Sequence, residues 1–440
     1  MKIMKKVFAL VLTLCMAATL FTGCQSKSKD TAKDSDSESD KAAVTSAADS
    51  TSDEAKVGGK LVIWDHTAQF DAPLKAVIEG FNQKYPDVEV EYQIKTADQY
   101  YNLLQTAMQA GEAPDLFWTN GTATTNYASY IKQGLLMDIS DKVDFSLYNG
   151  TNAMNLVTVD DKVYSTPTAE LGGRAVFYNK DIFTELGLQI PKTFSEFEKT
   201  LETIKKSKYI PISFCGSDPW AVLFQFEPVL AGMSLDWINE YGTKGDVAIN
   251  DKRVTAAYNK MLEWAKKGYY GKGYLGVDES GALLAFSKGD AAMCIEGTWN
   301  IQTIQQNNPD LNFGAFQIPC EDGSIPFVGT GSVGYSVSAN TENTDAAIAF
   351  ENYFASKEAQ AIWIKTLDSI PCSKEIQSEN PVVNDITNFT VQAESFYSIL
   401  GYLAKDGESP TNVWQEDQTK VFSGGLTPEK FTDELEKLTK

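Results

Sequence analysis

The sequence predicts an α/β protein with a parallel sheet, built as two domains or one large bilobed unit. Residues 60–64, KLVIW, are a continuous apolar run typical of a strand that is buried on both faces. Apolar side chains at 74, 77, 78 and 81 then repeat with helical spacing, and residues 88–94 alternate as a second strand. A strand, a helix and a strand at this spacing indicate a right-handed βαβ unit. The chain has 440 residues, 43% of them hydrophobic, which is enough for a sizeable core.

The following segments continue the same pattern. Residues 97–110 read as a helix that ends at Gly111, and residues 116–118 read as a short strand. Later come a strand at 175–178, a helix capped by Asn179, and further helices at 191–206, 346–355 and 357–367. These features are explained by core packing and need no ligand.

Residues 286–300, FSKGDAAMCIEGTWN, combine a fold signal with a candidate ligand contact. Lys288 and Gly289 end a helix, and residues 291–295 read as a short buried strand. We expect Gly297 to turn the chain and to present Trp299 at the end of that strand. An aromatic residue at the mouth of a strand is where α/β proteins place ligand contacts, so Trp299 is the first candidate.

Charge and composition exclude several classes of function. The formal net charge is -21, so the surface would repel a nucleic acid. A single histidine argues against a transition-metal receptor, and the glycine-rich residues 327–332 lack the lysine of a phosphate loop. We therefore expect no cofactor, no metal and no nucleic-acid partner.

The amino terminus reads as a targeting segment. Lysines at 2, 5 and 6 precede an uncharged apolar run at 7–21, and Thr22-Gly23-Cys24 follows. This arrangement resembles the lipobox of bacterial lipoproteins, with Phe21 where leucine is usual. We expect a signal peptide at 1–23, lipidation of Cys24 and a disordered tether over 24–57. An ordinary cleaved signal or a single anchor helix remain alternatives.

Four cysteines follow the tether, at 215, 294, 320 and 372. Their spacing is too wide and irregular for a zinc or iron–sulfur site. Any of them could pair outside the cell, whereas Cys294 lies in an apolar run where a thiol behaves as a small hydrophobe. The sequence leaves their pairing open.

Several segments in order resemble the extracellular solute-binding proteins of family 1, the group that includes maltose-binding protein. They include residues 60–93, GEAPDLFWTN, YIKQGLLMDIS, VYSTPTAELGGRAVFYNKDIFTELGL, PKTFSEFEKTLETIKK, GDAAMCIEGTW and SGGLTPEKFTDELEKL. The resemblance implies a sugar-capturing subunit of an ABC importer. Together with the lipobox-like segment at Cys24, it leads us to expect a monomer that is lipid-anchored to the outer face of the cytoplasmic membrane of a Gram-positive bacterium. It further implies a membrane permease and a separate ATPase as partners.

The same resemblance implies a type II periplasmic-binding-protein-like fold with an interlobe ligand cleft. Each lobe should be discontinuous in sequence. We expect lobe one over 58–169 and 329–372, and lobe two over 170–328 and 373–440. Ligand would stabilise a closed state through contacts that form from both lobes only on closure.

A sugar needs flat aromatic platforms beside fixed donors and acceptors. By chemistry, position and resemblance, the candidates are His66, Gln69, Trp118, Asn120, Glu170, Arg174, Asp218, Trp220, Glu296, Trp299, Gly331 and Trp414.

Several candidates also have a structural explanation. Trp118 and His66 could be core residues, Glu170 with Arg174 a surface salt bridge, and Asp218 a helix cap. The glycines near 331 suit a close backbone approach at a lobe crossing. Trp414 differs by about a turn from the register in the family, which leaves its role open.

Two rival functions compete with sugar capture. A receptor or adhesin for a non-sugar ligand, such as a peptide or polyamine, would use similar residues. A secreted glycoside hydrolase would need two carboxyl groups across a scissile bond, and Glu170, Asp218 and Glu296 are the candidates for such a set. We expect binding without catalysis.

Overall fold

The computed structural model describes residues 57–148, 153–168, 170–244, 248–331, 333–403 and 410–439. The predicted signal peptide, Cys24 and the tether up to residue 56 lie outside the described residues, as does residue 169, where the first lobe boundary was predicted. In the part of the chain that is described, no helix is long and apolar enough to cross a membrane.

The first sheet has the strand order β2-β1-β3-β12-β6. Its strands are β1 (Gly59–Asp65), β2 (Val88–Ile94), β3 (Leu116–Trp118), β6 (Thr166–Pro167) and β12 (Gly334–Val337). β1 runs parallel to both β2 and β3, which confirms the predicted βαβ unit. β12 is antiparallel to β3 and β6, so the sheet is mixed.

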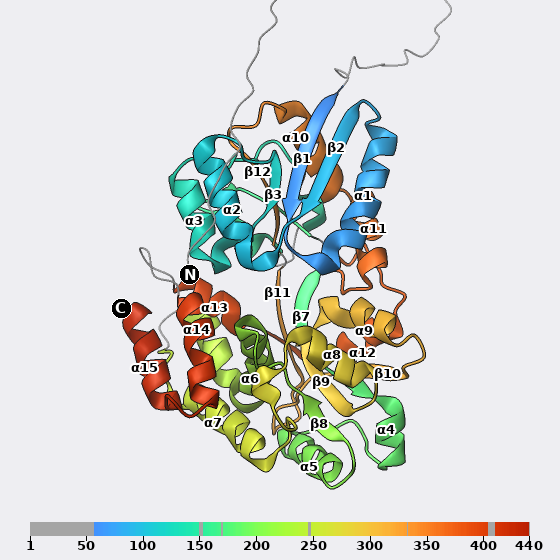
Figure 1. The fold of residues 1–440 in the computed structure, drawn as a ribbon, viewed down its shortest axis with the longest axis vertical. Coiled ribbons are helices and arrows are strands. Elements are labelled where there is room, and N and C mark those ends of the chain that lie inside the picture. Colours follow the sequence, from blue (N-terminus) through green and yellow to red (C-terminus); the bar gives the residue numbers. More distant parts are fainter. Residues whose placement is uncertain are drawn as a thin grey trace, which may run out of the picture. The chain divides into compact units, whose positions relative to one another are not determined.

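Helices pack around this sheet to form lobe one (Figure 1). The helices are α1 (Asp71–Lys84), α2 (Ala97–Ala110), α3 (Thr125–Lys132), α10 (Thr344–Ala355) and α11 (Lys357–Leu367). α2 and α11 have the predicted bounds, and Gly111 ends α2 with a left-handed backbone at φ 75°. The core of lobe one contains Leu61, Ile63 and Phe117 from the sheet, all fully buried.

The second sheet has the order β13-β11-β7-β9-β8, and β10 also pairs with β7. Its strands are β7 (Leu171–Asn179), β8 (Ile210–Ser213), β9 (Ala291–Gly297), β10 (Phe313–Phe316), β11 (Pro326–Gly331) and β13 (Val391–Ala393). The two short strands β4 (Thr158–Val159) and β5 (Lys162–Val163) form a separate antiparallel pair.

The helices around the second sheet complete lobe two. They are α4 (Lys180–Glu185), α5 (Phe194–Lys205), α6 (Pro219–Lys244), α7 (Lys252–Lys267), α8 (Glu279–Ser287), α9 (Ile301–Asn307), α12 (Pro381–Ile386), α13 (Phe396–Tyr402), α14 (Pro410–Phe422) and α15 (Pro428–Thr439). Asn179 caps α4 as predicted, because its Oδ1 accepts from the backbone N–H groups of Asp181 and Ile182.

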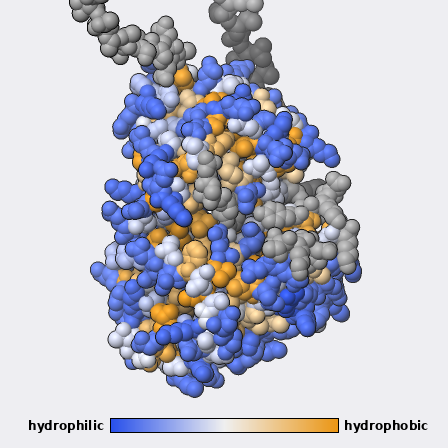
Figure 2. Space-filling model, turned by 180° about the vertical axis from the view of Figure 1, so that it is seen from behind, coloured by the Kyte–Doolittle hydropathy of each residue, from blue (hydrophilic) through white to orange (hydrophobic). Residues whose placement is uncertain are grey.

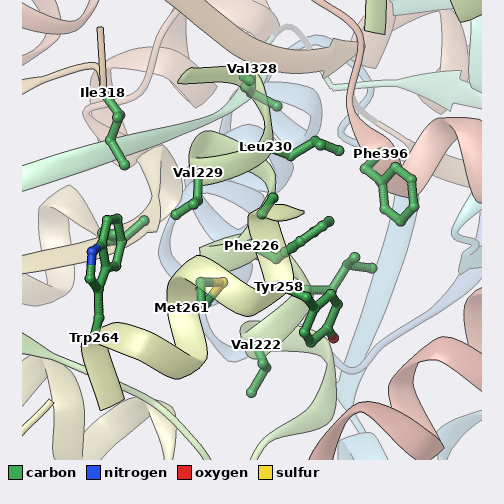
Figure 3. Close-up of a cluster of buried hydrophobic side chains, with 14 of the residues drawn as sticks. Val222, Phe226, Val229, Leu230, Tyr258, Met261, Trp264, Ile318, Val328 and Phe396 are labelled. Atoms are coloured by element: carbon green, nitrogen blue, oxygen red, sulfur yellow. The ribbon is translucent and has the colours of Figure 1, made fainter. Parts of the chain in front are cut away.

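One large apolar core holds these helices on the sheet. Figure 3 shows Phe226, Val229 and Leu230 of α6 beside Tyr258, Met261 and Trp264 of α7. α6 bends at Ser234, whose backbone is not helical. The carboxyl-terminal helices contribute to the same core, so they are integral to lobe two.

Extended segments connect the lobes. β11 pairs with the start of β7, where Gly329 lies opposite Gly173, and the backbone N–H of Leu171 donates to Ile370 O at 2.7 Å. A Cβ atom added to Gly173 would lie 2.1 Å from the Phe327 ring. Glycine is therefore required at residue 173 because the Phe327 ring packs directly on its backbone.

The surface is largely hydrophilic on the face shown in Figure 2, with hydrophobic residues gathered along its middle. Within the described residues, no group of three or more His, Cys, Asp or Glu side chains is arranged to hold a metal ion. The thiols of Cys215, Cys294 and Cys320 are buried and free.

Candidate functional site

Trp299 lies directly after β9, as the sequence predicted, but the turn forms differently. Gly297 has an extended backbone at φ -73° and ends the strand, and the 3₁₀ helix Thr298–Asn300 makes the turn. A Cβ atom on Gly297 would lie 2.2 Å from the indole of Trp299. Glycine is needed here because the Trp299 ring lies against the backbone, which fixes the ring at the end of the strand.

Four aromatic side chains in lobe two meet edge to face around Phe224. The ring centroids of Trp220, Trp299 and Tyr397 lie 5.6, 5.6 and 5.7 Å from that of Phe224. All four rings are half-buried, in contrast to the fully buried rings of the core. We call these four residues together with Arg174 the lobe-two wall. It offers apolar ring surface of the kind on which a sugar can stack.

Arg174 lies behind these rings and is almost completely buried. Its guanidinium carbon is 3.7 Å from the centre of the Phe224 ring and 5.0 Å from that of Trp299. Its Nε donates to Glu227 Oε2 at 2.8 Å. The sequence suggested a solvated salt bridge involving Glu170, whereas the ion pair is buried and made with Glu227. None of the described residues accepts a hydrogen bond from Nη1.

Glu296 lies beside the wall in a network of buried polar groups. Its Oε2 accepts from the backbone N–H of Gly297 at 3.2 Å and from Asn300 Nδ2 at 3.3 Å. The same Nδ2 donates to Glu279 Oε1 at 2.8 Å. Burial, followed by the nearby carboxylate of Glu279, raises the pKa of Glu296 well above its usual range. Its Oε1 has no hydrogen-bond partner among the described residues, so a protonated Glu296 could donate there.

Asp218 connects this network to two helices. Its backbone carbonyl accepts from Ala221 N in the first turn of α6, while its Oδ2 accepts from the backbone N–H of Glu279 at 2.8 Å. The carboxylate therefore bonds the first turn of α8 rather than capping α6, the structural alternative considered from the sequence. Trp220, two residues later, projects from α6 into the lobe-two wall.

The lobe-one candidates fall into two groups. Trp118 is 4% exposed, packs against Phe70 and Tyr335, and donates from Nε1 to Asn120 Oδ1 at 3.1 Å. It is a core residue, and the half-exposed Asn120 is the group that reaches the surface. Burial makes the ring of Trp118 unsuitable for the ligand contact considered from the sequence.

His66 and Gln69 follow β1 and are half-buried. The imidazole of His66 lies 4.6 Å from the Tyr100 ring and 5.5 Å from the Tyr101 ring. Burial lowers the pKa of His66 to about 4, so the ring is neutral at pH 7. The preceding Asp65 holds the loop by accepting from the backbone N–H groups of His66 and Thr67.

Three other candidates lie apart from the wall. Glu170 is buried at the lobe crossing in a bridge with Pro371, and Gly331 pairs with Leu171 in the crossing strands. Trp414 is fully buried against Phe396 and donates from Nε1 to Gln418 at 3.0 Å. Trp414 thus belongs to the core of lobe two.

Sequence reasoning missed Phe224, Glu227 and Tyr397. Phe224 was open to prediction, because it lies four residues after Trp220 on the same helix. Glu227 and Tyr397 carried no such signal. The two residues are 170 positions apart in the sequence and are joined by a hydrogen bond from the Tyr397 backbone N–H to Glu227 Oε1.

Two cavities in lobe two lie away from the wall. One, of about 680 Å³, is lined by Phe194, Met233 and several carboxylates, and the other, of about 440 Å³, lies beside Tyr178 and Asp385. The larger cavity has its main charges already paired, since Glu198 bonds Lys260 and Asp236 bonds Arg253. The half-exposed aromatic rings and unpartnered polar atoms favour the lobe-two wall as the candidate site.

Comparison with protein families gives a match to the bacterial extracellular solute-binding proteins over residues 64–361. The multiple sugar-binding protein of Streptococcus mutans is 28% identical over 72% of this chain and 76% of its own length. The diacetylchitobiose binding protein of Streptomyces coelicolor is 27% identical over 71% of this chain and 70% of its own length.

Solved structures show the same fold. A chitin oligosaccharide binding protein superposes with a TM-score of 0.73 at 23% identity, over 87% of this chain and 98% of that chain. A binding protein solved in complex with raffinose gives a TM-score of 0.71 at 20% identity, over 87% of this chain and 98% of that one. The two-lobed type II fold expected from the sequence is thereby confirmed.

Proposed function

The chain belongs to the bacterial extracellular solute-binding protein family, and from this premise we propose that it captures an oligosaccharide for an ABC importer. The ligand would be delivered to a membrane permease by a monomer held at the cell surface through a lipid on Cys24. We propose that the ligand binds between the two lobes assigned from the sequence. Lobe one consists of residues 58–169 and 329–372, and lobe two consists of residues 170–328 and 373–440.

One observation carries the proposal, the grouping of half-buried rings in the lobe-two wall. Stacking on Trp299 and its neighbours would cover the apolar face of a sugar ring. Trp299 Nε1, Arg174 Nη1 and Glu296 Oε1 have no partner among the described residues, so they are suited to bond hydroxyl groups. His66, Gln69 and Asn120 are the lobe-one groups that we propose to complete the site.

The names of the relatives support the class of ligand. Among them are binding proteins named for multiple sugars, diacetylchitobiose, and melibiose, raffinose and stachyose. We propose a carbohydrate for this chain on the same basis, with oligosaccharides preferred because the aromatic rings of the wall offer several adjacent contacts.

We propose binding without chemical conversion. Of the three carboxylates considered for a hydrolase, only Glu296 lies beside the wall, since Glu170 is buried in the bridge at the lobe crossing and Asp218 bonds the backbone of α8. A hydrolase needs two carboxyl groups exposed to the scissile bond. This arrangement supports a receptor.

A thermal-shift screen tests the proposal. A ligand that binds only the folded state raises the melting temperature in proportion to the logarithm of its concentration over Kd. We expect raffinose, diacetylchitobiose or another oligosaccharide to do so, and the sugar to be recovered intact after long incubation. A shift by peptides or polyamines alone would support the non-sugar receptor, and release of reducing ends would support the hydrolase.

A further inference from the structure

The carboxylate of Glu227 on α6 is fully buried and accepts three hydrogen bonds from two other segments, β7 and the start of α13. Its Oε2 accepts from Arg174 Nε at 2.8 Å. Its Oε1 accepts from Ser395 Oγ at 2.9 Å and from the backbone N–H of Tyr397 at 2.7 Å. One side chain therefore joins β7, α6 and the start of α13, which lie together in lobe two (Figure 1).

These bonds fix most of the lobe-two wall. Phe224 lies on the same helix as Glu227, one turn earlier, and the guanidinium of Arg174 lies over its ring. Tyr397 is held through its own backbone, and Trp299 contacts both Phe224 and Arg174. Removing the Glu227 charge would leave the Arg174 cation buried without its counter-ion, so the guanidinium would have to move.

The bond to Nε also determines what Arg174 can offer a ligand. Once Nε is engaged by Glu227, Nη1 remains as a buried donor without an acceptor among the described residues. A buried donor that only a ligand oxygen satisfies discriminates strongly against ligands that lack that oxygen.

We propose that Glu227 is a positioning residue of the ligand site, which holds Arg174 so that Nη1 meets a ligand oxygen and holds Tyr397 beside the stacking rings. The proposal rests on the proposed function in placing the ligand at this wall. The geometry of the Glu227 contacts can be tested without any ligand.

The ligand-free test uses the two arginines of the chain, Arg174 and Arg253. With ¹⁵N-labelled arginine, the protein should show two Nε–H signals, and Arg174→Lys identifies which belongs to Arg174. Arg253 is an internal reference, because its Nε donates to Asp251 at 3.0 Å. In Glu227→Gln we expect hydrogen exchange at Arg174 Nε to accelerate about tenfold or more, because a charge-assisted bond is lost. Unchanged exchange would overturn the proposal.

Folding of the variant is checked independently. If Glu227→Gln does not fold, Glu227→Asp keeps the charge with a shorter reach and should give a smaller acceleration at Arg174 alone. Asp236→Asn is the matched control, since Asp236 bonds Arg253 at 2.8 Å on an exposed part of the surface. It should leave the Arg174 signal unchanged. Equal effects of both substitutions on Arg174 would contradict a specific role for Glu227.

The binding test is a double-mutant cycle with the sugar that gives the largest thermal shift in the unmodified protein. We expect Arg174→Gln and Glu227→Gln each to weaken binding by about tenfold. If Glu227 acts through Arg174, the double variant should bind about as weakly as Arg174→Gln alone. Multiplicative losses would show two independent effects and overturn the proposal. If no sugar binds the unmodified protein, the proposed function fails, while the exchange measurement still decides the role of Glu227.

Discussion

Trp118 and Trp299 have the same local sequence context and opposite surroundings. Trp118 is the last residue of β3 and Trp299 lies two residues after the end of β9, and an asparagine lies within two residues after each. Trp118 is buried in the core of lobe one with its indole N–H bonded to Asn120. Trp299 is half-exposed, lies on the backbone of Gly297 and contacts Arg174. A strand end therefore supplies the position for a ligand contact, and the packing around it decides whether the ring is available.

The largest effect that we expect comes from the buried member of the pair. Trp118→Ala should lower the free energy of unfolding by about 3–5 kcal/mol, because it opens a cavity beside Phe70 and Tyr335. Urea denaturation measures this loss. A variant of normal stability that binds sugar poorly would instead place Trp118 in the site.

Trp299→Ala should have the reverse profile. Loss of the stacking surface should weaken binding of the best sugar by more than about tenfold, or about 1.4 kcal/mol. Because the ring is half-exposed, the melting temperature should change little. Titration of tryptophan fluorescence measures affinity, and Trp299→Phe, which keeps an aromatic ring, should retain most of it. If Trp299→Ala mainly unfolds the protein, Trp299 is a structural residue like Trp118.

The third expected effect is a dependence of stability on pH, which distinguishes Glu351, a buried carboxylate of lobe one, from Glu227 of lobe two. Glu227 is paired with Arg174, whereas Glu351 of α10 is fully buried with no cation beside it in the described part of the chain. The hydroxyl of Thr166 and the phenols of Tyr127 and Tyr148 lie close enough to Glu351 to interact with it electrostatically. Burial raises the pKa of Glu351 from 4.5 to about 8.

The sign of the pH dependence follows from this shift. Between pH 4.5 and 8 the folded state holds a proton on Glu351 that the unfolded chain has released, so stability falls as the pH rises through this range. Glu351→Gln should remove this decline, so the variant should be the more stable of the two proteins above pH 8. Melting temperatures of both proteins from pH 5 to 9 test it. Parallel curves would contradict a buried, titrating Glu351.

Local patterns in the sequence were sufficient to predict the bounds of many helices and strands. The bounds of β2, α2, β3 and α11 agree with the pattern, because apolar periodicity and glycine stops act over a few neighbouring residues. The strand at 175–178 was predicted too short, since β7 begins at Leu171. Its first residues pair with β11 across the lobe crossing, and such a long-range partner leaves no local pattern.

The candidate site was only partly open to such reasoning. Trp220, Trp299 and Arg174 were recognised by residue type, position and family resemblance, and the structure brings them together. Trp414 and Trp118 were equally suitable by type but are buried in the cores. Their exposure depends on how helices pack around each sheet, which no short segment encodes.

The sequence by itself determined the α/β class, the family and the strand that precedes Trp299. These follow from periodicity, from the ordered set of segments and from the glycine beside the ring. Only the tertiary structure decided which side chains form the lobe-two wall and that Glu227 holds it together. The reason is physical, because Arg174, Glu227 and Tyr397 become neighbours only when β7, α6 and α13 pack on one core.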